Sequence, residues 1–139
     1  MKHLLAIFFV AMLSGCATGP TIDHTYTAVS QDSRAQFLIL HYTAIDFPTS
    51  LKVLTEQNVS SHYLVRDIPP TIYQLVDDSR RAYHAGVSSW QGQTQLNAAS
   101  IGIEIVNLGY RDSPQGRTYF DFPSAQIDAV IALEPFHVG

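Results

Sequence analysis

The order of hydrophobic and polar residues predicts a domain that contains both strands and helices. Four segments have the composition of strands: residues 36–43, 60–65, 71–76 and 100–107. Residues 48–57 and 123–134 have helical character, with Pro48 suited to a first turn and apolar residues recurring at helical spacing in the second segment. Residues 80–97 and 108–121 are rich in glycine and small polar residues and are expected to be loops. The pattern predicts an α/β (mixed α+β) fold, with a central mixed β-sheet flanked by helices.

The start of the chain has the pattern of a secretion signal. The apolar run from Leu4 to Leu13 is too short to span a bilayer. A buried N-terminal helix is the alternative, and it is less favoured in a strand-rich domain. The run ends in Leu-Ser-Gly-Cys at residues 13–16, which resembles the lipobox of bacterial lipoproteins. That resemblance implies a signal peptide at residues 1–15 and acylation of Cys16, followed by a tether at 16–33 and a domain at 34–139.

The resemblance to a lipobox also implies a location. Several acyl chains on Cys16 would anchor the protein stably in a membrane. Because Ala17 rather than aspartate follows Cys16, the sorting signal resembles that of outer-membrane lipoproteins that face the periplasm. Cys16 is the only cysteine, so the sequence allows no internal disulfide.

Composition narrows the classes of partner. The chain has 139 residues, enough for one small domain, and its 46% hydrophobic and 14% charged residues fit a globular protein. Its formal net charge of −4, with no basic patch, argues against a nucleic-acid partner.

Two polar residues interrupt otherwise apolar strands and are the first candidates for chemistry. Glu104 lies in the run Ile-Gly-Ile-Glu-Ile-Val, on the face opposite the isoleucines. A buried carboxylate is costly unless it is paired or belongs to a site, and burial raises its pKa toward the range of a general base. No Lys or Arg lies within six residues of it, although a distant partner such as Lys52 or Arg66 stays open. His41 ends the first strand and, taken alone, is more often a core histidine.

Other residues admit both a structural and a functional interpretation. His62, in a strand, and His84, in a loop, are each more often structural when taken alone. Trp90 and Tyr110 lie in predicted loops, where their rings suit either stacking on a sugar or anchoring the loop.

Four short motifs occur together, in order: His41-Tyr-Thr-Ala, Ser61-His-Tyr-Leu-Val, Tyr83-His-Ala-Gly and Asn97-Ala-Ala-Ser-Ile-Gly-Ile-Glu. This combination resembles the type 2 N-acetylmuramoyl-L-alanine amidases, relatives of phage T7 lysozyme and the peptidoglycan recognition proteins. With the lipobox, it is most similar to the outer-membrane lipoprotein branch of that family.

The resemblance implies an activity and a role for individual residues. Members hydrolyse the amide between N-acetylmuramic acid and L-alanine in peptidoglycan, in cell-wall turnover and recycling. His41 corresponds to a zinc ligand and Glu104 to the catalytic base. His84 and Asn97 correspond to residues that line the cleft for peptidoglycan or its muropeptide fragments.

The sequence departs from the family in its metal ligands. The family's other two ligands, a His in a His-x-Asp segment and an Asp in an Asp-Pro-Gly segment, have no counterpart, so one of three expected Zn²⁺ ligands is present. We therefore expect a domain truncated at its C-terminus, with little zinc or activity of its own. Its last helix would dock on an unfinished sheet and expose Val130, Ile131 and Leu133.

Two other functions compete with an active amidase at the cell envelope. A peptidoglycan-binding module that has lost catalysis would also lack metal ligands. A cytosolic amidase that recycles anhydro-muropeptides is the second, and the lipobox argues against it.

Overall fold

The computed structural model describes residues 22–133. These residues belong to two units, and the boundary between the units in the sequence falls between Gln31 and Asp32. Residues 22–31 contain no helix or strand, and the second unit holds all the elements described below. The predicted signal peptide and Cys16 lie outside the described residues. Within residues 22–133, no helix is both long enough and apolar enough to cross a membrane.

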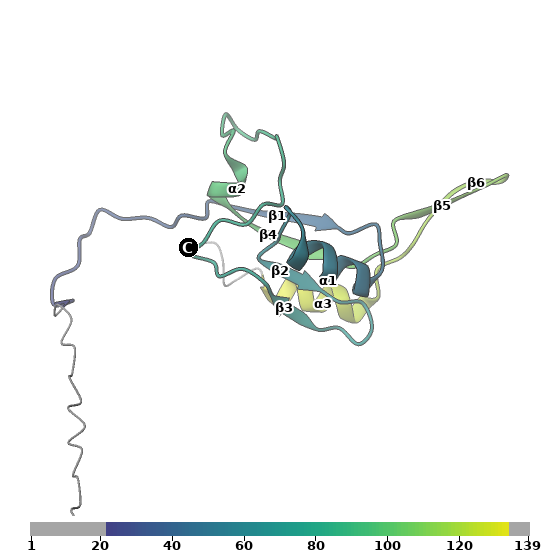
Figure 1. Ribbon diagram of the computed structural model, residues 1–139, viewed down its shortest axis with the longest axis horizontal. Helices are drawn as coiled ribbons and strands as arrows, with labels where there is room; N and C mark the ends of the chain where they lie inside the picture. The colour runs from purple at the N-terminus through teal and green to yellow at the C-terminus, as the bar shows by residue number, and fades with distance from the viewer. Residues whose placement is uncertain (1–21, 134–139) are drawn as a thin grey trace, which may run out of the picture. The chain divides into compact units, whose positions relative to one another are not determined.

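A four-stranded mixed sheet forms the centre of the domain (Figure 1), in the order β1-β4-β2-β3. The strands are β1 (Phe37–Tyr42), β2 (Tyr63–Val65), β3 (Ile72–Gln74) and β4 (Ser100–Ile105). Strand β4 pairs in parallel with both β1 and β2, whereas β2 and β3 pair antiparallel. The predicted mixed sheet and the positions of its strands are therefore confirmed, with somewhat shorter strands.

Two helices pack on opposite faces of this sheet. Helix α1 (Phe47–Glu56) begins at Asp46, whose carboxylate accepts a hydrogen bond from the amide of Thr49 at 3.0 Å. Its Leu54 packs with Leu64 on the face that carries the even-numbered residues of β4. Helix α3 (Ser124–Leu133) covers the other face (Figure 1), where it packs on the odd-numbered residues of β4. The two flanking helices are thus confirmed.

The last helix is docked more completely than the sequence suggested. Val130 and Leu133 are 6% and 8% exposed and belong to the main core, so the expectation that they would be exposed is wrong for both. Ile131 is 55% exposed, as expected. The buried amide of Gln126 fixes the helix further by donating to two backbone carbonyls, those of Val65 at 3.1 Å and Val106 at 2.8 Å.

The predicted loop at residues 108–121 is instead a β-hairpin. Strands β5 (Tyr110–Ser113) and β6 (Gly116–Tyr119) pair antiparallel and extend away from the four-stranded sheet (Figure 1). Both strands are exposed on both faces, so they lack the apolar alternation that identifies a strand in a sequence. The turn closes at Gly116, whose φ of 120° suits glycine. The other predicted loop, 80–97, contains only the start of a short helix, α2 (Leu96–Ala99).

Candidate active site

The parallel pairing of β1 and β4 places His41 directly beside Glu104. The two residues are register partners, and Leu64 of β2 is the partner of Glu104 on its other side. His41, Gly102 and Glu104 lie on the face that α1 covers, because the His84 ring rests against Gly102, contacts His41 and shares a cavity with Glu104. His41 and Glu104 therefore lie on the same face of the sheet.

Glu104 lies in a cavity of about 180 Å³ between β4, α1 and the loop that carries His84. Its walls include Tyr42, Tyr83 and His84. Among residues 22–133, the one Lys or Arg ion pair joins Arg117 to Asp112, so neither Lys52 nor Arg66 neutralises Glu104. Burial raises the pKa of the Glu104 carboxyl.

His84 is held in place at both of its ring nitrogens. Its Nδ1 lies 3.1 Å from Nε2 of His41, and its Nε2 lies 3.3 Å from the hydroxyl of Ser100. The ring rests on Gly102, where a Cβ atom would lie well inside 3.0 Å of three ring atoms. Burial first, and the neighbouring imidazoles and Arg34 second, lower the pKa of His84 to about 4. Burial also lowers the pKa of His41, so both rings are neutral near pH 7.

The hydrogen bonds around His84 determine which ring nitrogens carry protons. The Ser100 hydroxyl donates to the carbonyl of Leu96 at 2.5 Å, so its oxygen is left to accept from Nε2–H of His84. A neutral His84 protonated at Nε2 has a lone pair on Nδ1, which accepts from Nε2–H of His41. The chain of bonds therefore leaves the lone pair of His41 on Nδ1, where a ligand or a proton can bind.

The sequence suggested that His62 lies within a strand, but it lies just before β2, because β2 begins only at Tyr63. Its ring holds the backbone of neighbouring segments together. It is fully buried, and its Nδ1 accepts from the amide of Gly102 at 3.0 Å. Its Nε2 lies 3.1 Å from the carbonyl of Arg80 and 3.2 Å from the guanidinium of Arg34. The ring centroids of His62 and His84 are 5.8 Å apart, but both nitrogens of His62 are occupied. His62 thus ties β2 to β4 beneath the site.

Asn97 anchors the loop that carries His84. Its side-chain oxygen accepts from the amides of His84, at 3.0 Å, and Ala85, at 2.8 Å. Asn97 does not line the cavity of Glu104. A direct contact between Asn97 and substrate stays a prediction.

The described residues do not by themselves fit a catalytic zinc ion. Within residues 22–133, no three side chains of the ligand types come together as a metal site. Nδ1 of His41 has the electronic character of a ligand atom, but zinc in a catalytic site needs three protein ligands.

The arrangement is one that transfers protons: an unpaired, half-buried carboxylate lies beside two neutral imidazoles in a cavity. Sequence reasoning found His41, Glu104, His84 and Asn97 but missed Ser100, whose role depends on the junction between α2 and β4. The Asn97-x-x-Ser100 spacing was the available signal.

Comparisons with known proteins identify the family. Residues 31–134 match the family model described as N-acetylmuramoyl-L-alanine amidase. The N-acetylmuramoyl-L-alanine amidase AmiD of Escherichia coli (strain K12) is 42% identical over 136 residues, which cover 88% of this chain and 49% of AmiD. The 1,6-anhydro-N-acetylmuramyl-L-alanine amidase AmpD of Salmonella typhimurium (strain SL1344) is 31% identical over 113 residues, covering 79% of this chain and 53% of AmpD.

Solved structures share the fold. Crystalline AmpDh3 from Pseudomonas aeruginosa matches with a TM-score of 0.74 and 38% identity, over 86% of this chain and 53% of that one. AmiD from E. coli, in complex with anhydro-N-acetylmuramic acid-L-Ala-D-γ-Glu-L-Lys, matches with a TM-score of 0.75 and 40% identity, over 87% of this chain and 51% of that one.

The chain belongs to the N-acetylmuramoyl-L-alanine amidase family, as its four motifs predicted. It spans about half the length of the curated relatives it matches. Members of this family are generally zinc-dependent.

Proposed function

We propose that this domain provides the active site of a hydrolase that cuts the amide between N-acetylmuramic acid and L-alanine in peptidoglycan. The observation that carries the proposal is Glu104: a carboxylate without a cationic partner among residues 22–133, with a pKa raised by burial, in a cavity beside His84. A carboxylate kept in this state for structural reasons alone would be destabilising. The relatives AmiD and AmpD are both named as amidases of muramyl-L-alanine, which supports the same amide bond as the one cut.

In the proposed reaction, Glu104 takes a proton from the water that attacks the lactyl carbonyl of N-acetylmuramic acid. It then gives that proton to the amine of L-alanine as the amide bond breaks. A raised pKa suits both steps, because the carboxyl must accept and release a proton near neutral pH. His84, fixed by Ser100 and His41, forms one wall of the cavity, where it orients the substrate.

We propose Zn²⁺ as the cofactor and His41 as the ligand that this chain contributes. The lone pair left on Nδ1 of His41 supports this role. The described residues supply no second or third ligand grouped with His41. Mass spectrometry of the protein expressed from its complete gene tests the assignment. We expect one zinc per chain, and loss of most of it in His41→Ala, whereas an unchanged zinc content in that variant contradicts the role.

The activity is tested on the compound bound in the AmiD complex, anhydro-N-acetylmuramic acid-L-Ala-D-γ-Glu-L-Lys. We expect mass spectrometry to detect the free tripeptide and the free sugar acid. The competing function is a module that binds muropeptides without cutting them. Binding of this compound without tripeptide release by the protein from the complete gene would establish that function instead.

We also propose that the protein is a lipoprotein of the outer membrane, facing the periplasm. The apolar run that ends at Cys16 and the small residue after it support this location. Metabolic labelling with a palmitate analogue should mark the wild type and leave Cys16→Ser unmarked. Equal labelling of both, or recovery of the protein in the cytosolic fraction, would favour the cytosolic recycling function.

A further inference from the structure

A groove of about 490 Å³ lies beside the Glu104 cavity, along the end of α1, and is here called the α1 groove. Four residues line both the cavity and the groove: Leu54, Val59, Ser60 and Tyr83. The other walls of the groove are polar: Thr55, Gln57 and Asn58. Because the two spaces share these walls, a substrate whose amide lies at Glu104 has room for one of its two halves in the α1 groove.

Tyr83 separates the cavity from the groove and is fixed through its backbone. Its amide donates to the hydroxyl of Ser60 at 3.0 Å, and its carbonyl accepts from the amide of Ser60 at 3.1 Å. Ala82 is fully buried, whereas Tyr83 is 50% exposed and Arg81 is also exposed. The side chains of Arg81 and Tyr83 therefore lie together on the outer side of this segment.

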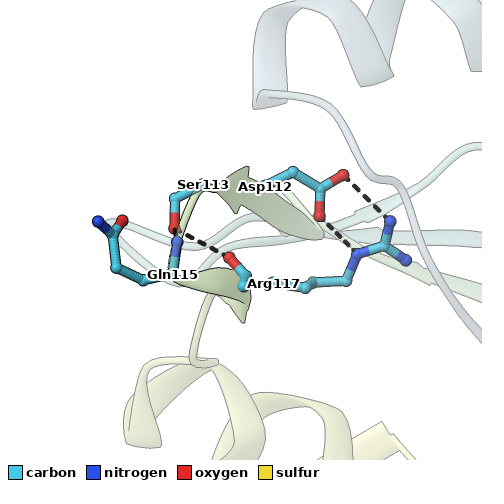
Figure 2. Close-up of polar contacts among 5 residues, drawn as sticks. Asp112, Ser113, Gln115 and Arg117 are labelled. Carbon is cyan, nitrogen blue, oxygen red and sulfur yellow. Dashed lines mark hydrogen bonds and ion pairs between the residues drawn. The ribbon is translucent and has the colours of Figure 1, made fainter.

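Arg81 is held against the ring of Tyr83. Its Nη2 donates to the Tyr83 hydroxyl at 2.7 Å, and its guanidinium carbon lies 4.8 Å from the centre of the ring. Among residues 22–133, no carboxylate neutralises it, because the one ion pair of a Lys or Arg there joins Arg117 to Asp112 (Figure 2). Arg81 is thus a positioned cation without an anionic partner in this part of the chain, beside the wall that the cavity and the groove share.

The charges of the substrate indicate which of its halves suits a cation. The lactyl carboxylate of N-acetylmuramic acid is used to form the amide, so the sugar half carries no charge. The other half is the stem peptide, which begins at L-alanine. In the compound bound in the AmiD complex, the next residue is a D-glutamate linked through its side chain, which leaves its α-carboxylate free. That carboxylate is the charged group nearest to the scissile amide, about 7 Å away for two extended residues.

We propose that Arg81 binds the α-carboxylate of the γ-linked D-glutamate while the stem peptide lies in the α1 groove, a proposal that rests on the proposed function. A guanidinium presents a fork of N–H groups that matches the two oxygens of a carboxylate. The contacts with Tyr83 fix the guanidinium in advance, which reduces the entropy lost on binding. The side-chain amides of Gln57 and Asn58 supply donors and acceptors for a short peptide.

Binding of two compounds that differ in one group tests this proposal. One is anhydro-N-acetylmuramic acid-L-Ala-D-γ-Glu-L-Lys, and in the other the α-carboxylate of the glutamate is replaced by a carboxamide. Calorimetry measures both affinities in Glu104→Gln protein from the complete gene, in which hydrolysis is slow. We expect the acid to bind roughly five- to tenfold more tightly, between the effect of an exposed ion pair and that of a hydrogen bond to a charged group. This preference does not require hydrolysis, so the proposed function can fail while this proposal stands.

Arg81→Gln, made in the same protein, should bind the acid and the amide with nearly equal affinity. Arg117→Gln is the matched control, because it also removes one exposed arginine, from a hairpin where that arginine is paired with Asp112 (Figure 2). It should keep the preference for the acid, and circular dichroism should show one fold for all three proteins. The proposal is overturned if the parent protein binds both compounds equally, or if Arg81→Gln keeps the preference. Loss of as much preference in Arg117→Gln as in Arg81→Gln also overturns it.

Discussion

Replacement of Gly102 by alanine should disturb the site through a single methyl group. Gly102 lies in the middle of β4, bonded on both sides to His62: its amide donates to Nδ1 and its carbonyl accepts from the His62 amide, both at 3.0 Å. The backbone there has little room to shift. The new Cβ would lie within 3.0 Å of Cγ, Cδ2 and Nδ1 of His84. Because Cγ is the attachment point of the ring, rotation of the ring alone does not relieve the overlap.

Two effects of opposite sign determine how much Gly102→Ala changes the unfolding free energy. An alanine in a strand gains about 0.5–1 kcal/mol over glycine because the unfolded chain has less freedom to lose. Overpacking a filled position costs about 1–3 kcal/mol. We therefore expect Gly102→Ala to lose about 1–2 kcal/mol of unfolding free energy, and to displace His84 from its contacts with His41 and Ser100.

A double-mutant cycle in urea measures this effect. In the His84→Ala background the ring is absent, so Gly102→Ala should be neutral or stabilising by up to about 1 kcal/mol. The difference between the two backgrounds is the coupling energy. If Gly102→Ala costs the same with and without the His84 ring, the argument that the glycine makes room for this histidine is refuted.

Three further predictions concern stability. Gln126→Leu should lower the unfolding free energy by about 2 kcal/mol in urea, since two buried carbonyls lose their donor; an unchanged midpoint would contradict it. Ala44 has a left-handed φ of 56°, which is strained for alanine and not for glycine. Ala44→Gly should therefore raise the unfolding free energy by about 0.5–1 kcal/mol. A decrease of about 0.5–1 kcal/mol, the usual cost of introducing a glycine, would argue against strain at this position. Burial, and then the bond to Asp78, raise the pKa of Tyr63 to about 12. The stability advantage of the wild type over Tyr63→Phe should be full below pH 10 and shrink between pH 10 and 12, and a difference independent of pH would contradict this.

The sequence was sufficient for the four strands of the central sheet and for the face of β4 that carries Glu104. Isoleucine alternates strictly with other residues along this strand, and successive side chains of a strand point to opposite faces. The face of each residue therefore follows from the local sequence alone. The pairing of His41 with Glu104 is different, because it depends on the register of two strands more than sixty residues apart. Only the resemblance to a known family brought these residues together before the structure did.

The hairpin and the bonds that fix His84 were not predictable in the same way. Strand patterns are recognised by a buried face, and β5 and β6 have none. Tyr110 and Tyr119 become partners only when Gly116 closes the turn. Ser100 acts on His84 because the short helix α2 supplies the carbonyl of Leu96, a contact that no spacing rule predicts.

The most direct test of the central claim compares the wild type with Glu104→Gln on anhydro-N-acetylmuramic acid-L-Ala-D-γ-Glu-L-Lys. Both proteins are expressed from the complete gene, and released tripeptide is quantified by its new α-amine. The glutamine keeps the size of the side chain but cannot take the proton, so we expect a loss in rate of about 10²-fold or more, with an unchanged zinc content. Near-normal release of the tripeptide by Glu104→Gln would contradict the account.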